Sequence, residues 1–391
     1  MNARSMMAAG WVAAMSVLLA GAGFDDFKSV DAAKASEALV LKLSTDINKV
    51  DHSIEVTKEL IKNSPDAPYL ADLYYRLAEL HVERSRYVFA RLMELRPEGS
   101  ESSLAGEKAL EVQISKRLAI ETYDKILTEY PNYDKNDEIM FFKGHEYREL
   151  GEFDEMLKDY ETLISKYPKS PWAIEARLII GDHHFDKSEF DAAEAKYQGI
   201  LDLPESHLHD MARYKLAWIR INQERFADSL KLFELAVKSK RKDRRGAVGD
   251  AHSLDVKREA LTAMVWPFSE VRKAHEAPEY FRKLADSKTL YVEVLKKLAN
   301  RYFVKTEYGS AALLYREVVR LSANLGENVE YIQRIYESIR SMSAKNPKRY
   351  ANAAIDVRAM VDNAARFQND YRYSDERRRS CSRTLRSERG T

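Results

Sequence analysis

The sequence predicts an all-α fold in which pairs of helices stack into a solenoid. Aromatic side chains recur at steps of 37, 37 and 36 residues, at Tyr123, Tyr160, Tyr197 and Phe233. Prolines keep the same step, and each follows its aromatic by seven or eight residues, where it would end a helix. The composition also favours helices with short turns, since there are only 14 glycines and 10 prolines among 391 residues.

Small residues repeat in the same register. They occupy the middle of each expected first helix, and each expected second helix carries another one four residues before its aromatic, with Met156 as a larger exception. We expect the small residues to leave room where two helices cross and the rings to fill the remaining space. The side chains predicted to form this packing are Gly144, Tyr147, Tyr160, Gly181, Ala193, Tyr197, Ala217, Phe233, Ala299, Ala311 and Tyr315.

This pattern resembles the tetratricopeptide repeat (TPR), a helix pair with a period of about 34 residues. The resemblance implies a right-handed superhelix of about five to seven repeats, in which stacking supplies most of the stability. Three regular repeats are expected within residues 137–239, and a degenerate repeat followed by a regular one within residues 255–345. The degenerate pair is broken at Trp266-Pro267.

The first 22 residues predict a secretory signal peptide. Arg4 is their only charge, Met6 to Ala20 is apolar, and Ala20-Gly21-Ala22 forms a small-x-small cleavage site. An uncleaved anchor is the alternative, although the apolar run is shorter than the ~20 residues that span a bilayer. We expect cleavage after Ala22, a periplasmic location and no transmembrane span in the mature chain. No cysteine near the site could accept a lipid, so a lipoprotein is not expected.

Residues 23–136 are expected to hold N-terminal helices and the first repeat. Helices are predicted over residues 35–62 and 69–95, with a second helix of the repeat from Ser115 to Tyr130 and an insertion at residues 96–106. Apolar residues in the first of these helices follow coiled-coil spacing. They are Val40, Leu43, Ile47, Val50, Ile54, Thr57 and Ile61. This seam predicts either packing within the domain or self-association through residues 40–61.

The remaining segments are less regular. Residues 240–254 form a basic linker, residues 346–371 a closing helix, and residues 372–391 an arginine-rich tail that is expected to be disordered. Cys381 is the only cysteine, so no intrachain disulfide can form. Removal of the signal peptide leaves equal numbers of basic and acidic side chains, which argues against nucleic acid as a partner.

The sequence predicts no enzyme. It lacks a glycine-rich phosphate loop, GxSxG, HExxH and paired CxxC motifs, so no catalytic residue, cofactor or metal is expected. Asp182-His183-His184 and His207-x-His209 contain metal-ligand residue types. Adjacent helical histidines point about 100° apart, however, and the second group falls in a turn, so we interpret both as structural or solvated.

A partner-binding groove is expected where the first helices of successive pairs line a concave face. Trp218, Tyr214 and Phe185 could anchor a peptide, and Arg148 and Arg220 could pair with carboxylates. Packing of Trp218 and Phe185 between repeats is the alternative. The predicted groove residues are Phe141, His145, Arg148, Asp182, Phe185, Tyr214, Trp218, Arg220, Ile221, Asn300 and Phe303.

A basic patch could instead bind anionic polymers. Six of the eight residues from 238 to 245 are basic, namely Lys238, Lys240, Arg241, Lys242, Arg244 and Arg245. A solvated linker is the simpler interpretation. The alternative function is a binding module for cell-wall or lipid polymers.

Residues 120–170, 213–237 and 258–271 resemble the exported TPR proteins of myxobacteria and relatives, including those associated with gliding motility. They are more distantly similar to envelope TPR proteins of the Tol-Pal system and of outer-membrane assembly, and the resemblance covers roughly residues 38–345. It implies a periplasmic scaffold that joins proteins or peptides of the cell envelope. An enzymatic function would require a further domain beyond the arginine-rich end.

Overall fold

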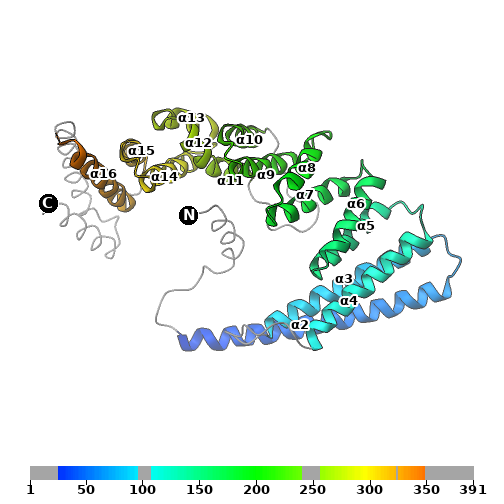
Figure 1. Cartoon of the computed structure of the whole chain (residues 1–391). Coiled ribbons are helices and arrows are strands. Elements are labelled where there is room, and N and C mark those ends of the chain that lie inside the picture. Colours follow the sequence, from blue (N-terminus) through cyan, green and yellow to red (C-terminus); the bar gives the residue numbers. More distant parts are fainter. Residues whose placement is uncertain (1–24, 96–106, 240–255, 323–324, 348–391) are drawn as a thin grey trace. The chain divides into compact units, whose positions relative to one another are not determined.

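The computed structural model describes residues 25–95, 107–239, 256–322 and 325–347, and all regular elements within these ranges are helices (Figure 1). The predicted all-α fold class is therefore confirmed. The signal peptide, the insertion at 96–106, the linker and the segments after residue 347 lie outside the described residues. The chain divides into two compact units, Met1–His183 (unit 1) and His184–Thr391 (unit 2), with the division inside α7 (Pro171–Asp186).

Unit 1 begins with three long helices that lie side by side, α2 (Asp25–Asn63), α3 (Leu70–Glu94) and α4 (Glu107–Glu129) (Figure 1). They are followed by α5 (Asn136–Glu149) and α6 (Phe153–Lys166), which pack on each other. The helix predicted from Ser115 starts earlier, at Glu107. Lysine, glutamine and glutamate between these positions are strong helix formers, so nothing in the sequence stops the helix from beginning there.

The apolar seam of α2 is covered by the same chain. Val50 and Ile54 pack with Leu77 and Leu80 of α3. Ile47 packs with Val88 of α3 and Val112 of α4. Of the two interpretations of the seam, the structure supports packing within the domain, because a seam that is buried against α3 and α4 cannot also bind a second copy.

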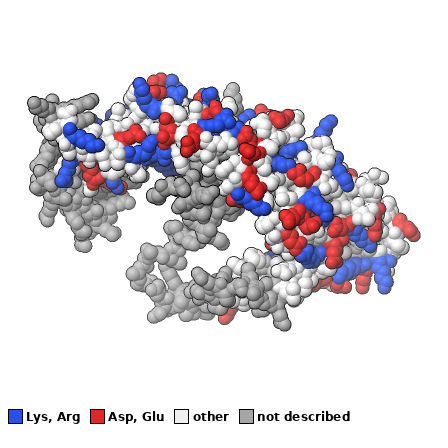
Figure 2. Space-filling view, in the orientation of Figure 1, with Lys and Arg blue, Asp and Glu red and all other residues white. Residues whose placement is uncertain are grey.

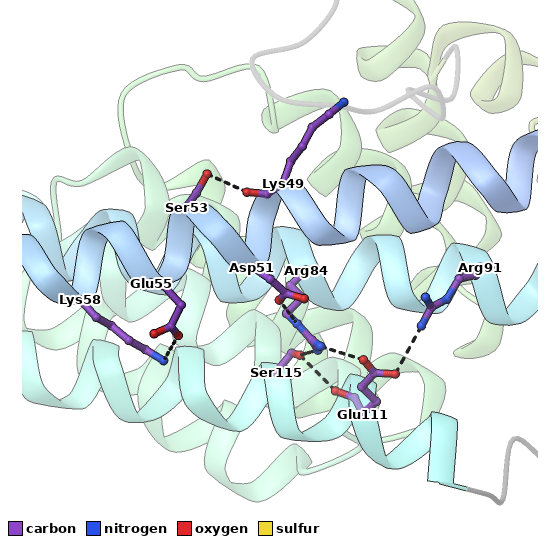
Figure 3. A network of polar contacts seen from close by, with 9 residues as sticks. All are labelled: Lys49, Asp51, Ser53, Glu55, Lys58, Arg84, Arg91, Glu111 and Ser115. Carbon is purple, nitrogen blue, oxygen red and sulfur yellow. Dashed lines mark hydrogen bonds and ion pairs between the residues drawn. The ribbon is translucent and has the colours of Figure 1, made fainter.

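A polar clamp joins the same three helices (Figure 3). The Arg84 guanidinium on α3 donates from Nε to Asp51 Oδ1 of α2 at 2.6 Å. Its Nη1 donates to Ser115 Oγ at 2.8 Å and its Nη2 to Glu111 Oε1 at 2.7 Å, both on α4. Because the planar guanidinium donates in three directions at once, this single side chain links α3 to both α2 and α4.

Unit 2 contains the remaining helices, and one continuous cluster of buried apolar side chains runs from α9 to α16. The elements are α8 (Phe190–Leu201), α9 (His209–Asn222), α10 (Phe226–Lys238), α11 (Val256–Ala263), α12 (Val265–Val271), η2 (Ala274–Glu276), α13 (Ala277–Leu284), α14 (Lys288–Val304), α15 (Tyr308–Leu321) and α16 (Leu325–Lys345). Pro267 is the third residue of α12, a position where the missing N–H costs no helical hydrogen bond. It therefore separates α11 from α12 without disrupting either.

The turn between the two helices of a pair recurs with the same backbone geometry. Among the described residues, those with positive φ are Gly151, Ser188, Glu224 and Thr306, each two residues before the aromatic that opens the second helix. The residue after each of them donates its N–H five residues back, as Glu152 does to the Tyr147 carbonyl at 2.9 Å and Glu307 to the Tyr302 carbonyl at 2.9 Å. This is the Schellman helix end. Its repetition shows that the sequence period is a structural period.

The predicted packing residues lie in the core. Tyr160, Tyr197 and Phe233 are fully buried, and so are Ala193, Ala217, Ala299 and Ala311, while Tyr315 is nearly so. Gly181 is buried and Tyr147 is half-buried. At Gly144, an added Cβ would lie 2.5 Å from the Tyr160 ring, so no larger residue fits without movement. The handedness of the superhelix stays a prediction.

Candidate protein-binding surface

Three half-buried side chains from different helices of unit 2 stack in sequence. The Trp218 ring of α9 meets the Trp266 ring of α12 edge-on, with centroids 6.2 Å apart at 88°. The Arg301 guanidinium of α14 lies over the other indole, 4.8 Å from the Trp266 centroid. We call Trp218, Trp266 and Arg301 the ladder. Tryptophan and arginine are the residue types that contribute most to protein interfaces, because each combines a large flat surface with a polar edge.

Polar contacts hold the end of the ladder in place. Arg301 Nε donates to Ser269 Oγ at 2.6 Å, and its Nη2 lies 2.8 Å from Glu270 Oε1. Lys305 Nζ contacts both Glu270 oxygens at 3.0 Å. Although partial burial alone would raise the pKa of Glu270, hydrogen bonds from Arg301 and Lys305 lower it overall, so the carboxylate stays charged. The arginine plane is therefore fixed before any partner binds, which reduces the entropy lost on binding.

Tyr214 and Trp218, two predicted groove residues, pack on the core and remain partly exposed. The Phe233 ring lies 5.6 Å from the Tyr214 ring and 5.9 Å from the Trp218 ring, both edge-on. Each ring is only half-buried. Trp218 can therefore pack between repeats and also anchor a peptide. The Trp218 ring packs against Phe233 and Trp266 and keeps part of its surface exposed.

Two other groove predictions on α9 receive less support. Ile221 is 4% exposed within the apolar core of unit 2, so a partner could not reach it. Arg220 is already paired with Glu194 through both terminal nitrogens and also donates to Gln223 Oε1 at 2.7 Å. The hydrogen bond from Arg220 lowers the pKa of Glu194. A partner carboxylate would have to displace this intramolecular pair, so we leave both residues out of the proposed surface.

In unit 1, Phe141 packs between the Tyr160 and Trp172 rings, at 5.6 and 4.9 Å. His145 Nε2 lies 3.2 Å from Glu149 Oε1, and Arg148 is exposed. Asp182 of the same unit is half-buried. The structure therefore places Phe141 in repeat packing and leaves Arg148 accessible.

The last groove predictions belong to unit 2. Phe185 packs edge-on against Phe190 at 5.7 Å, with Lys215 Nζ 5.9 Å from its centroid. The Arg334 guanidinium lies over the Phe303 ring, 4.7 Å from the ring centroid. Asn300 is exposed. Phe303 and Arg301 lie about 200° apart around α14, so Phe303 is not part of the ladder.

The predicted basic patch is represented only by Lys238, which pairs with Glu234; Lys240 to Arg245 lie outside the described residues. Over the described part of the face in Figure 2, basic and acidic side chains are interspersed. The charge on that face does not gather into a field of one sign.

Sequence reasoning missed Trp266 and Arg301. Trp266-Pro267 was interpreted as a break in a degenerate repeat, and Arg301 followed no repeat register. The only signal was a tryptophan immediately before a first-turn proline, which marks the start of a helix and not a surface.

The histidine groups have structural partners. His209 Nδ1 accepts the Ser206 N–H at 2.9 Å where α9 begins, and His184 Nδ1 lies 2.6 Å from Glu189 Oε2. Within the described ranges, no three His, Cys, Asp or Glu side chains cluster so that they could hold a metal ion. In those ranges there is also no helix with the length and hydropathy needed to cross a membrane.

Comparison with known proteins places the fold. Residues 140–263 match the family described as a tetratricopeptide repeat-like domain. No curated protein matches the sequence. Among solved structures, a tetratricopeptide repeat protein from Parabacteroides merdae is 16% identical with a TM-score of 0.37, covering 78% of this chain and 99% of that one. Yeast Tom70 is 14% identical with a TM-score of 0.32, covering 86% of this chain and 70% of that one. The family match over residues 140–263 and the recurring turns between paired helices together identify the fold as an all-α tetratricopeptide-repeat solenoid.

Proposed function

We propose that this tetratricopeptide-repeat solenoid is a non-catalytic scaffold that binds proteins or peptides of the cell envelope through the ladder of unit 2. Helix-pair solenoids present extended surfaces on which other chains lie. The observation that carries the proposal is the fixed stack of Trp218, Trp266 and Arg301. Such a stack suits an extended segment that carries an aromatic or apolar residue.

The envelope location is part of the proposal and is supported by the predicted signal peptide and by the resemblance to exported myxobacterial proteins. Gliding motility and envelope maintenance are the processes that this resemblance favours. Expression in a Gram-negative host, followed by N-terminal sequencing of the periplasmic fraction, tests the location. The mature chain should begin at Gly23. A chain that keeps Met1 and stays in the cytoplasm would contradict export.

Affinity capture from a solubilised envelope fraction tests the scaffold function. The variants Trp266→Leu and Arg301→Met leave an apolar side chain at each position but remove the indole and the guanidinium. Each should weaken the binding of a captured partner by about 2 kcal/mol, roughly 30-fold, because hot-spot residues contribute this much. Leu235→Ser is the matched control, since Leu235 is an exposed apolar residue of α10 outside the ladder.

Two results would count against the proposal in different ways. If the wild-type chain with intact repeats captures no stable protein partner, the scaffold function fails. If partners bind the ladder variants as tightly as the wild type, the scaffold function stands but its surface lies elsewhere.

A further inference from the structure

Glu270, near the end of α12, is shared by two cations of α14. Its Oε1 lies 2.8 Å from Arg301 Nη2, and Lys305 Nζ lies 3.0 Å from each of its two oxygens. Arg301 and Lys305 are four residues apart, so they lie on the same face of α14. A single acid from another helix therefore contacts both the guanidinium of the ladder and the ammonium beside it.

The charges in this group balance. Lys305 Nζ also lies 3.3 Å from Glu307 Oε1, so two cations stand against two carboxylates. The exposed fractions of the Arg301, Glu270 and Lys305 side chains lie between 25% and 32%, so water and salt screen these charges only in part. Burial acts to raise the pKa of Glu270, but hydrogen bonds from Arg301 and Lys305 lower it overall, and the carboxylate stays ionised. A partner therefore meets a group without net charge.

A charged partner segment would bind poorly at such a group. A carboxylate that approached Arg301 would be repelled by Glu270, which contacts the same guanidinium, or would have to displace it. A cationic side chain would meet Arg301 and Lys305. An uncharged segment avoids both costs, because its aromatic or apolar side chain can lie on the half-buried rings of Trp218 and Trp266 without disturbing the ion pairs.

We infer that Glu270 is a specificity-determining residue of the ladder, which restricts the partner to an uncharged segment that carries an aromatic or apolar residue. This inference rests on the proposed function, because it concerns the partner that binds at Trp218, Trp266 and Arg301. Glu270 acts through Arg301 and Lys305 and does not need to touch the partner. Removing its charge while keeping its shape should turn the ladder into a site that accepts acidic segments.

Selection from a random heptapeptide library on the full chain tests the inference. The baits are the wild type, Glu270→Gln and Trp266→Leu, and peptides that also bind Trp266→Leu are discarded because they do not need the ladder. Glu270→Gln keeps the length of the side chain and an oxygen that can accept from Arg301, so it removes only the charge. The wild type should enrich aromatic residues and deplete Asp and Glu, whereas Glu270→Gln should enrich peptides with an acid beside the aromatic residue.

Fluorescence anisotropy titration of the selected peptides gives the size of the effect. An acidic peptide should bind Glu270→Gln about tenfold more tightly than the wild type at low salt, and this difference should shrink at about 0.5 M salt, where Coulomb attraction is screened. A merely structural role of Glu270 would not produce this salt dependence. Glu270→Asp keeps the charge and should reject acidic peptides as the wild type does.

The matched control is Glu279→Gln, which removes an exposed acid of α13 that pairs with Lys283 at 2.7 Å. It should enrich the same peptides as the wild type. If no peptide requires Trp266, the proposed binding surface fails and this inference fails with it. If peptides require Trp266 but the wild type and Glu270→Gln enrich the same ones, or the wild type itself enriches acidic ones, the proposed function stands and the specificity assigned to Glu270 is overturned.

Discussion

The three N-terminal helices of unit 1 and the helices of unit 2 are held together by different interactions. In unit 1, buried apolar side chains form several separate small clusters, and ion pairs such as the Arg84 clamp join neighbouring helices. In unit 2, one continuous apolar cluster runs from α9 to α16. Both parts bury apolar side chains, but those of unit 1 form separate clusters with charged pairs between the helices, whereas those of unit 2 form one cluster.

This difference has consequences for the solution behaviour of each unit. Lys116 of α4 pairs with Glu146 of α5 at 2.8 Å, and both side chains are buried. Hydrogen bonds from His145 and Lys116 hold the pKa of the adjacent Glu149 at about 2. Unit 1 should therefore respond to pH and to loss of a charged partner, whereas unit 2 should respond mainly to loss of apolar volume. Hydrogen-exchange mass spectrometry reads the two units separately.

The largest effect is expected in the core of unit 2. Phe233→Ala removes a fully buried ring that contacts Tyr214 and Trp218, and should lower the free energy of unfolding of unit 2 by about 4 kcal/mol. Exchange in α9 and α10 should accelerate accordingly, while α2 to α4 should keep wild-type protection. A loss below about 1 kcal/mol would show that the cluster is not continuous in solution.

Breaking the buried ion pair of unit 1 should have a slightly smaller effect. Lys116→Met leaves Glu146, which is 2% exposed, as an uncompensated buried charge, and should cost unit 1 about 3 kcal/mol. Adding Glu146→Leu should restore most of that loss, because both charges are then absent. If the double variant is no more stable than Lys116→Met alone in urea titration, the pair is not what holds α4 to α5.

The pH dependence of unit 1 should come next in size. His81 is 4% exposed, and burial followed by the nearby Lys58 and Arg84 lowers its pKa from 6.5 to about 4, against the weaker opposing influence of Asp51 and Glu55. Between these values the unfolded chain binds a proton that the folded chain does not, so stability is full above pH 6.5 and falls below it. The loss down to about pH 5 should be about 2 kcal/mol.

His81→Gln should flatten this slope, since it removes the titrating ring and leaves the surrounding charges. Denaturant titrations at several pH values measure both chains. An equally steep slope in the variant would assign the pH dependence to other groups.

The smallest predicted effect concerns the recurring turns of the two units. Thr306 adopts φ 62° in unit 2, where Gly151 occupies the equivalent position in unit 1 at φ 78°. Thr306→Gly should stabilise unit 2 by up to about 1 kcal/mol, and Gly151→Ala should destabilise unit 1 by a similar amount. Melting curves of the two variants should therefore shift in opposite directions; shifts of the same sign would contradict an equivalent turn.

Several features of the fold could be predicted from the sequence because they depend on local periodicity. The burial of Tyr160, Tyr197 and Phe233 follows from a period that is visible in the residues themselves. The left-handed backbone conformation of three turn residues could not be predicted, because the helix end imposes it on residue types that do not prefer it. These residues are Ser188, Glu224 and Thr306.

The candidate site was less predictable because it depends on packing between elements far apart in the sequence. Ile221 was expected in the groove, but α9 contacts both α10 and α11, and the second contact buries a face that a single helix pair would leave open. Trp266 and Arg301 are 35 residues apart and meet only when α12 lies against α14. Periodicity carries no information about such a meeting.

The central claim is that helix pairs nest because a small residue at the crossing leaves room for an aromatic ring. A double-mutant cycle on Gly144 and Tyr160, read by urea unfolding of unit 1, tests it most directly. Gly144→Ala should cost about 2 kcal/mol when Tyr160 is present, because overpacking displaces the ring, and well under half of that in a Tyr160→Ala background. Equal costs in the two backgrounds would mean that the ring does not occupy the space above the glycine, and the account of the repeat would be wrong.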